Sequence, residues 1–270
     1  MIIGVDGNEA NVREKVGVSV YTFKHLFYFQ QKANKNLRFI VFLKNPPYKD
    51  LPDETEFYTY KVIKGSFLWS QIFLPIALFK NIFSRERINV FFSPAHYTPR
   101  FAFCPIVVTI HDVAYLHFPG EFLKKDLYQL KNWTSYSLKT SHTIITVSKT
   151  TKRDVINYYH IPEHKIEVIY NGFEKEFEEH DVEGIGEKLI PKITPPYILY
   201  VGTIQPRKNI ITLIRAITFL NKTHPDFKLV ITGKKGWLFD QIFKEARHLY
   251  LENKIIFTGY VTEEELVYLY

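Results

Sequence analysis

The stretch YILYVGTIQPRKN at residues 197–209 indicates the fold class of this 270-residue chain. An apolar, β-prone run enters a glycine turn, and the residues from 209 to about 221 then have helical spacing. Strand, glycine turn and helix in this order are typical of one repeat of a doubly wound, Rossmann-like parallel sheet. Two more apolar runs follow, KLVITG at 228–233 and KIIFTGYV at 254–261, with a helical segment between them. We therefore predict an α/β, Rossmann-like domain over residues 196–270.

The end of the chain, TEEELVYLY at 262–270, is predicted to begin another helix. Thr262 and Glu265 have the spacing of a capping box, in which each residue satisfies a backbone amide of the other. Three strands are fewer than a doubly wound sheet normally contains. We therefore expect this C-terminal domain to be incomplete in the present chain.

The N-terminal part of the chain shows the same alternation. MIIGV is followed by an amphipathic run from about 18 to 31, and the later apolar runs are LRFIVFL, INVFFS, PIVVTI, HTIITVS and KIEVIY. Apolar runs separated by helix-length segments predict a parallel sheet that is covered on both faces. We predict a Rossmann-like domain over 1–175. The segment at 176–195 is acidic, then rich in Gly and Pro, without an apolar period, and is the predicted interdomain linker.

Composition narrows the protein classes. The chain is 46% hydrophobic and 16% aromatic, which supports packed cores and argues against a disordered protein. Its single cysteine, Cys104, excludes an intramolecular disulfide, and the N-terminus lacks the apolar core of a signal peptide, so a cytoplasmic location is expected. The net charge is +7, but no dense Lys/Arg run with interleaved aromatic residues occurs, which disfavours nucleic acid as a partner.

The most apolar stretch covers residues 67–83. Serine, glutamine, proline, lysine and asparagine interrupt it, so it is too short and too polar to span a bilayer. A buried core helix is the first interpretation. Because aromatic and basic residues continue to Arg87, a peripheral contact with the inner face of a membrane is the alternative.

Gly17 marks the first candidate binding loop. The GxGxxG fingerprint of dinucleotide enzymes does not follow the first strand, which disfavours a nicotinamide dehydrogenase. Instead, VGVSVY at 16–21 places a glycine at the start of a helix, where the backbone could approach an anion. An ordinary turn is the alternative.

His111 marks the second candidate position. THD follows the apolar run PIVVTI, so the histidine is expected at the C-terminal end of a parallel strand, where side chains face the ligand crevice and could hydrogen-bond a substrate. The alternative is a histidine whose ring is satisfied by local backbone groups.

The turn from Gly202 to Asn209 carries the third and strongest signal. Arg207 and Lys208 are expected beside a helix N-terminus that Asn209 or a neighbour could cap. Two cations and free backbone amides directed at one place suit a diphosphate.

Two more glycine loops follow strands of the C-terminal domain. These are GKKGW, beginning at Gly233, and GYV, ending at Val261. Both are expected on the same edge of the sheet, where their backbones could hold a base and a ribose. Ordinary turns are an equal alternative for each.

The ordered set of motifs resembles glycosyltransferase family 4, especially its mannosyltransferase-like branch. The matching segments are GVSVY, VFFSPAHYTP, PIVVTIHDVAYLHFP, ITVSKTTKRDVINYY, KIEVIYNG, PYILYVGTIQPRKNIITLIRAI, KLVITGKKGW and FTGYVTEEELVYLY. The resemblance implies the GT-B fold, with two Rossmann-like domains. It also implies a retaining transfer of a hexose, such as mannose, from a nucleoside diphosphate sugar to a glycan or lipid-linked acceptor.

The resemblance also implies roles for single residues. His111 matches the histidine that contacts the transferred sugar, while Arg207 and Lys208 match the basic pair that neutralises the diphosphate. Gly17 matches the loop near the donor phosphate and the acceptor. The turn at Gly202, with the loops of Gly233 and Val261, matches the donor-binding edge. No Asp-x-Asp occurs in the chain, in agreement with a route that needs neither metal nor cofactor beyond the donor substrate.

One part of the family pattern is missing. The family carries two glutamates with seven residues between them in the second half of the C-terminal domain, whereas this chain ends at Tyr270. Glu179 and Glu187 have that spacing but lie in the acidic linker, which indicates coincidence. We therefore interpret the chain as a truncated glycosyltransferase. The alternative is a non-catalytic protein that binds nucleotide sugars.

Overall fold

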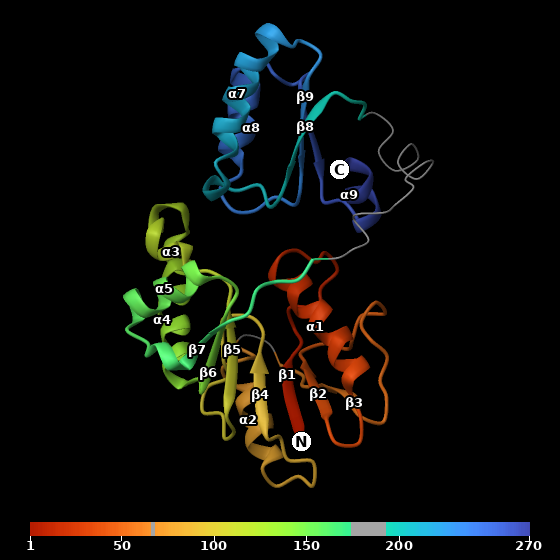
Figure 1. The fold of residues 1–270 in the computed structure, drawn as a ribbon, viewed down its shortest axis with the longest axis vertical. Helices are drawn as coiled ribbons and strands as arrows, with labels where there is room; N and C mark the ends of the chain where they lie inside the picture. Colours follow the sequence, from red (N-terminus) through yellow and green to blue (C-terminus); the bar gives the residue numbers. More distant parts are fainter. Residues whose placement is uncertain (66–67, 174–192) are drawn as a thin grey trace. The chain divides into compact units, whose positions relative to one another are not determined.

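A computed structural model describes residues 1–65, 68–173 and 193–270 of the chain (Figure 1). These residues form two compact units. The first unit comprises Met1–Pro119 and Lys124–Gly172, and the second comprises Gly120–Leu123 and Phe173–Tyr270. Most of the predicted linker, including Glu179 and Glu187, lies outside the described residues.

The first unit is built on one parallel sheet of seven strands in the order β3-β2-β1-β4-β5-β6-β7. The predicted parallel sheet is confirmed, but β3 was not predicted, because its sequence YTYKV has no continuous apolar run. The strands are β1 (Ile2–Asp6), β2 (Arg38–Leu43), β3 (Tyr58–Val62), β4 (Val90–Ser93), β5 (Ile106–Ile110), β6 (Thr143–Thr146) and β7 (Ile166–Val168). The order runs in one direction from β1 to β3 and in the other from β4 to β7, so a topological switch point lies between β1 and β4.

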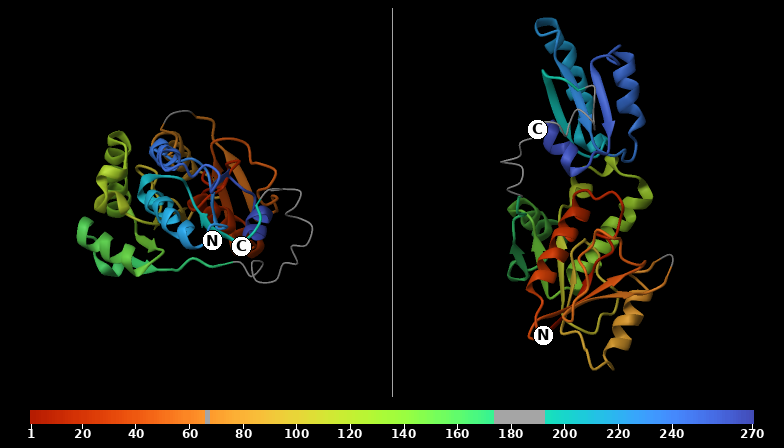
Figure 2. Two further views of the ribbon diagram at one scale, coloured as in Figure 1. Left: turned by 90° about the horizontal axis from the view of Figure 1, so that it is seen from above. Right: turned by 90° about the vertical axis from the view of Figure 1, so that its right-hand side faces the viewer.

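Helices cover both faces of this sheet (Figures 1 and 2). They are α1 (Val18–Lys32), α2 (Phe73–Asn81), α3 (Ala114–His117), α4 (Lys124–Thr140) and α5 (Lys149–Tyr159). Consecutive residues of β2 point to opposite faces of the sheet, and each face has its own hydrophobic core. Val41 packs in the cluster that contains Leu26 of α1, and Phe42 packs in the cluster that contains Leu74 of α2. This two-sided burial explains why the strand sequences are apolar throughout.

Helix α2 is only half buried. Leu74 and Leu78 are buried against the sheet, whereas Ile76 and Phe79 on the same helix are exposed. The prediction of a core helix therefore holds for one face of α2 and fails for the other. No helix in the described ranges is both long and apolar enough to cross a membrane.

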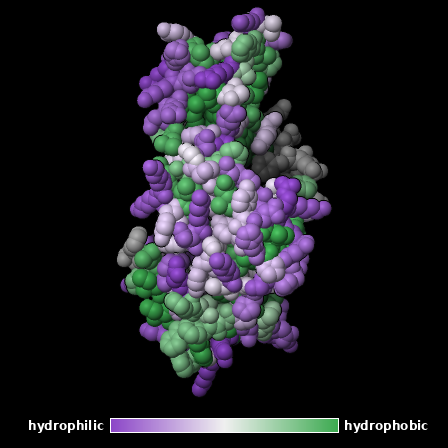
Figure 3. All heavy atoms as spheres, turned by 90° about the vertical axis from the view of Figure 1, so that its left-hand side faces the viewer, coloured by the Kyte–Doolittle hydropathy of each residue, from purple (hydrophilic) through white to green (hydrophobic). Residues whose placement is uncertain are grey.

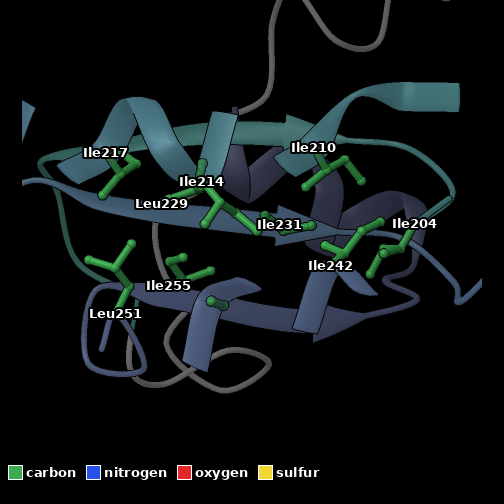
Figure 4. Packing of buried hydrophobic residues seen from close by; sticks show 10 residues of the cluster. Ile204, Ile210, Ile214, Ile217, Leu229, Ile231, Ile242, Leu251 and Ile255 are labelled. Atoms are coloured by element: carbon green, nitrogen blue, oxygen red, sulfur yellow. The ribbon is translucent and has the colours of Figure 1, made fainter. Parts of the chain in front are cut away.

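The second unit contains a parallel sheet of three strands in the order β10-β9-β8. Its elements are β8 (Tyr197–Val201), α7 (Ile210–Thr223), β9 (Lys228–Thr232), α8 (Asp240–His248), β10 (Ile255–Gly259) and α9 (Glu263–Leu269). Isoleucines from α7 and α8 pack on one face of the sheet (Figure 4). The other face carries a smaller cluster that includes Val230 of β9 and Leu269 of α9. The predicted alternation of strands and helices is confirmed here.

Helix α9 begins with the predicted capping box. The Thr262 hydroxyl accepts a hydrogen bond from the Glu265 amide at 3.2 Å, and the Glu265 carboxylate accepts one from the Thr262 amide at 2.7 Å. A cap of this kind contributes about 1 kcal/mol. The helix start is therefore encoded locally, by four consecutive residues.

Candidate functional site

Three neighbouring strands of the first unit end in ionisable side chains at the carboxyl edge of the sheet. Asp6 is the last residue of β1, His96 follows β4 by three residues, and His111 comes directly after β5. Strands β1 and β4 flank the switch point, and in open α/β sheets ligands bind outside the carboxyl ends of the strands at such a point. The predicted position of His111 at the carboxyl end of a strand is thus confirmed, and its part in binding stays a prediction.

His111 is held in a defined tautomer. Its Nε2 lies 2.8 Å from the carbonyl oxygen of Pro94, and a carbonyl oxygen can only accept, so Nε2 carries the proton. Burial lowers the pKa of His111 and favours the neutral ring. Nδ1 then keeps a lone pair, for which the described residues provide no hydrogen-bond donor. The side chain can therefore accept a hydrogen bond from a hydroxyl group of a ligand.

Aromatic rings from other elements fix the orientation of His111. The Tyr21 ring of α1 meets it edge-on, with ring centroids 4.7 Å apart, and the His96 ring lies at 5.5 Å. The Tyr21 hydroxyl in turn hydrogen-bonds Thr109 of β5 at 3.3 Å. The backbone carbonyl of His111 accepts a hydrogen bond from the Thr151 hydroxyl at 3.1 Å. Helix α1, strand β5 and helix α5 thus position the ring together.

Gly17 lies at the N-cap of α1, close in the chain to this cluster. Its φ of +50° is a left-handed conformation that favours glycine, and a Cβ atom there would meet no atom within 4 Å. Its carbonyl accepts the Tyr21 amide hydrogen at 3.0 Å, so the turn of helix that begins at Gly17 ends at the tyrosine that contacts His111. The structure therefore brings the predicted residues Gly17 and His111 to the same edge.

His96 was not identified from the sequence. It has a φ of +49°, and its Nδ1 is buried without a hydrogen-bond partner among the described residues. Burial, with a smaller contribution from His111, lowers the pKa of His96 to about 4. The available signal was its place shortly after the strand sequence VFFS. Asp6 was also missed, and burial raises its pKa to about 6.

We expect His96 to make the first unit less stable in mild acid. Its folded pKa lies below the ordinary value of about 6.5, so the unfolded chain binds a proton that the folded chain does not. Its stabilising contribution is complete above about pH 6.5 and is lost as the pH falls towards 4. Asp6 has the opposite effect on stability. Because its pKa is raised, the folded chain takes up that proton at a higher pH than the unfolded chain does, which favours the folded state in mild acid.

The measurement is therefore a difference between two proteins. The free energy of unfolding in urea is measured at pH 6.5 and at pH 5. Between these two values it is expected to fall by about 1 to 2 kcal/mol less in His96→Asn than in the unsubstituted chain. Asparagine tolerates the left-handed backbone and does not titrate. An equal fall in the free energy of unfolding in the two proteins would contradict the lowered pKa of His96.

The carboxyl edge of the second unit carries the predicted basic pair. Arg207 and Lys208 form a short 3₁₀ helix with Pro206, and Lys208 is exposed. Asn209 lies at the N-cap of α7, as expected, but its side chain accepts the Thr212 hydroxyl at 2.7 Å and makes no cap bond to a backbone amide. The predicted side-chain cap by Asn209 or a neighbour does not form, because the left-handed backbone of Asn209 (φ +52°) departs from the extended conformation of a capping residue. An anion could occupy the place beside these two cations.

Two buried side-chain oxygens at the same turn lack partners among the described residues. They are the Tyr200 hydroxyl and Oε1 of Gln205, a residue that is only 3% exposed. The Tyr200 hydroxyl lies 3.0 Å from the place that a Cβ atom would take at Gly202. Buried polar atoms without partners are rare in folded proteins, and a bound ligand is one way to satisfy them. Sequence reasoning did not single out either residue.

Gly233 and Val261 have structural roles at this edge. A Cβ atom at Gly233 would lie 2.1 Å from the carbonyl oxygen of Gly202, so the two glycine turns touch. The Gly233 amide donates to the Gly259 carbonyl at 2.8 Å and is not available to a ligand. The Val261 side chain packs against the cluster of Val230 and Leu269. A role for these loops in binding a base stays a prediction.

Metal-ligating side chains do not gather within the ranges that the structure describes. No group of three or more His, Cys, Asp or Glu residues there could hold a metal ion. The expected metal-independent route stays a prediction.

Comparisons with known proteins agree with this architecture. The family profile of Glycosyltransferase Family 4 matches residues 17–177, more than half of the chain, and that of Glycosyl transferases group 1 matches residues 183–270. The chain is 26% identical over 171 residues to the O-antigen chain mannosyltransferase B of Escherichia coli, covering 61% of this chain and 44% of that protein. It is 30% identical over 175 residues to an uncharacterized glycosyltransferase of Methanocaldococcus jannaschii, with coverages of 62% and 43%. This chain thus spans less than half the length of these relatives.

A solved structure supports the fold. The crystal structure of HepE from Anabaena in complex with UDP and glucose matches with a TM-score of 0.66 at 16% identity, covering 98% of this chain and 71% of that chain. Such a likeness at low identity concerns the fold alone. With the family matches, it shows that this chain belongs to Glycosyltransferase Family 4 and has the α/β, GT-B architecture.

Proposed function

We propose that this chain is part of a retaining hexosyltransferase that moves mannose from a nucleoside diphosphate sugar to a glycan or lipid-linked acceptor in the cytoplasm. The observation that carries the proposal is the turn after β8. There, Arg207 and Lys208 lie at the start of α7, and the buried oxygens of Tyr200 and Gln205 have no partner among the described residues. A nucleoside diphosphate supplies the negative charge that suits the cations. Its sugar and ribose hydroxyls can donate to the two oxygens.

The basic turn would assist departure of the leaving group. Transfer breaks the bond between the anomeric carbon of the sugar and an oxygen of the diphosphate, so negative charge grows on the diphosphate as positive charge grows on the sugar ring. Fixed cations beside a helix N-terminus stabilise that negative charge without rearranging during the reaction. Arg207 and Lys208 are the residues to which we assign this role.

His111 would orient the sugar. Its neutral ring presents Nδ1 as an acceptor, because Nε2 donates to the Pro94 carbonyl. A sugar hydroxyl can donate to Nδ1, and a neutral imidazole does not repel the positive charge that develops on the ring. Retention of the anomeric configuration rests on the family.

Relatives support the choice of donor and sugar. The similar Escherichia coli protein is named an O-antigen chain mannosyltransferase, and the Anabaena structure contains UDP and glucose. Mannose and a saccharide acceptor are proposed on the first of these. The nucleoside diphosphate is proposed on the second, without a choice of base.

His111→Ala is expected to abolish most transfer while nucleotide binding stays nearly unchanged. Loss of one hydrogen bond that orients the reacting sugar should lower the rate by about 100-fold or more. A transfer assay with a panel of nucleotide sugars, together with calorimetric titration of the nucleoside diphosphate, measures the two effects separately. His224→Ala, an exposed histidine of the second unit, is the control and should change neither.

Two other outcomes are informative. Equal loss of nucleotide binding and transfer in His111→Ala would show a structural histidine. If the unsubstituted chain binds a nucleotide sugar tightly but transfers nothing to any acceptor tested, the alternative of a non-catalytic nucleotide-sugar-binding protein is favoured.

A further inference from the structure

Helix α2 and its neighbouring loops present a continuous apolar surface on the first unit. We call it the α2 surface, and its exposed fractions range from 45% to 79%. Its apolar members are Ile72 (45%), Ile76 (49%), Phe79 (46%), Phe83 (79%) and Phe103 (49%). In the space-filling view, hydrophobic residues gather over the lower part of the first unit (Figure 3). Single exposed apolar residues are normal, whereas a contiguous group marks an interaction site.

The group is contiguous because it follows one face of the helix. Ile72, Ile76, Phe79 and Phe83 are spaced by four, three and four residues, which places them on the same side of α2. The Phe79 ring lies 5.7 Å from the Phe83 ring and 5.0 Å from the Phe103 ring, measured between centroids. The opposite side of α2, with Leu74 and Leu78, is buried in the core. Helix α2 is therefore apolar on both sides, although only the side with Leu74 and Leu78 is buried.

Positive charge borders the α2 surface. Lys80, Arg85 and Arg87 are exposed in and after the helix. Glu86 is the only acidic residue between positions 68 and 104, and its carboxylate pairs with Arg38 at 2.6 Å. Aromatic rings flanked by unbalanced cations are complementary to an interface that is apolar below and anionic at its surface.

We propose that the α2 surface docks on a lipid bilayer that contains anionic lipids. The phenylalanine rings would enter the boundary between headgroups and acyl chains, while Lys80, Arg85 and Arg87 contact lipid phosphates. A second copy of this chain fits less well. A two-fold contact through the same surface would bring these cations against their own copies, and like charges in contact repel.

This docking leaves the carboxyl edge of the first sheet accessible. Phe83 follows the end of α2, from which the chain enters the amino end of β4, and Phe103 lies just before the amino end of β5. His111 lies at the opposite, carboxyl end of β5. The proposal does not depend on sugar transfer, since the surface and the candidate site are at opposite ends of these strands.

Vesicle cosedimentation of the full chain tests the proposal. The unsubstituted chain is expected to pellet with vesicles of phosphatidylcholine and phosphatidylglycerol, and much less with phosphatidylcholine alone. The triple variant Lys80→Gln, Arg85→Gln, Arg87→Gln should bind anionic vesicles about 100-fold more weakly, because each surface cation contributes about fivefold. Phe79→Ser with Phe83→Ser should weaken binding by about tenfold or more.

Phe219→Ser is the matched control. Phe219 is 68% exposed on α7 of the second unit, so this variant removes an exposed phenylalanine without touching the α2 surface. Its vesicle binding should equal that of the unsubstituted chain. Circular dichroism checks that each variant is folded.

Several results would overturn the proposal. They are no pelleting with either vesicle, equal binding by all variants, or a dimer that forms without lipid and is lost in Phe79→Ser with Phe83→Ser. The last result would assign the surface to a second copy. Nucleotide titration of the same proteins keeps the two proposals apart, because a chain that binds vesicles but no nucleotide would refute only the proposed function.

Discussion

Replacing Arg207 and Lys208 together by alanine is expected to weaken nucleoside diphosphate binding by several kcal/mol. Each charge-assisted contact to a phosphate is worth roughly 1.5 to 3 kcal/mol, and a tenfold change in affinity corresponds to about 1.4 kcal/mol. The pair lies where the chain leaves β8 and enters α7, and the described residues provide no side-chain cap for that helix. With both cations removed, the diphosphate would keep only neutral partners at this turn.

Calorimetric titration with nucleoside diphosphates measures this loss. Lys131→Ala with Lys139→Ala on α4 is the control, because it removes the same number of positive charges from the first unit. Its affinity should stay the same at a fixed salt concentration. If the Arg207 and Lys208 variant binds as tightly as the control, the assignment of the donor site to this turn is wrong.

Gly233→Ala is expected to cause the largest loss of stability in the second unit. A Cβ atom there would lie 2.1 Å from the carbonyl oxygen and 2.6 Å from the carbonyl carbon of Gly202, and φ is +139°. Backbone atoms at the end of a neighbouring strand cannot move aside as the tip of a side chain can. We expect a cost of about 3 kcal/mol or more, with a separation of the turns that follow β8 and β9.

Gly259→Ala separates the steric effect from backbone strain. Gly259 also has a positive φ, +79°, but a Cβ atom there would meet nothing within 4 Å, so its replacement should cost only about 1 to 2 kcal/mol. Hydrogen exchange of peptides from β8 and β9 during urea unfolding reports on the second unit separately. Equal losses in the two variants would show that the contact between Gly202 and Gly233 is unimportant for stability.

The sequence was most informative where the signal is local. A capping box depends on four consecutive residues, and the one at Thr262 forms as predicted. The start of α1 depends on a glycine that tolerates a positive φ, which Gly17 provides. Strand β3 was missed because Tyr58–Val62 lacks the continuous apolar run of the central strands, although its alternation of apolar and polar residues also indicates a strand.

The sequence predicted where the candidate sites lie, but not all of the residues that form them. A side chain that follows an apolar strand must lie at the carboxyl edge of a parallel sheet, so His111 and the turn at Arg207 could be located from sequence. The position of His96 after the strand sequence VFFS was visible, but its burial and its contact with His111 require β4 and β5 to be neighbours. Gln205 could not be singled out from the sequence, because only the residues packed around its side-chain oxygen show that this oxygen is buried without a hydrogen-bond partner.

By itself, the sequence determined the alternation of strands and helices, the parallel sheets and the edges on which functional side chains lie, because these follow from hydrophobic periodicity and turn chemistry. Tertiary structure decided which side chains meet and which stay uncovered. Composition showed that the segment of α2 is apolar, but only packing against the sheet showed that Leu74 and Leu78 face the core while Phe79 faces outward. Burial is a property of pairs of elements, and the sequence of one element cannot specify it.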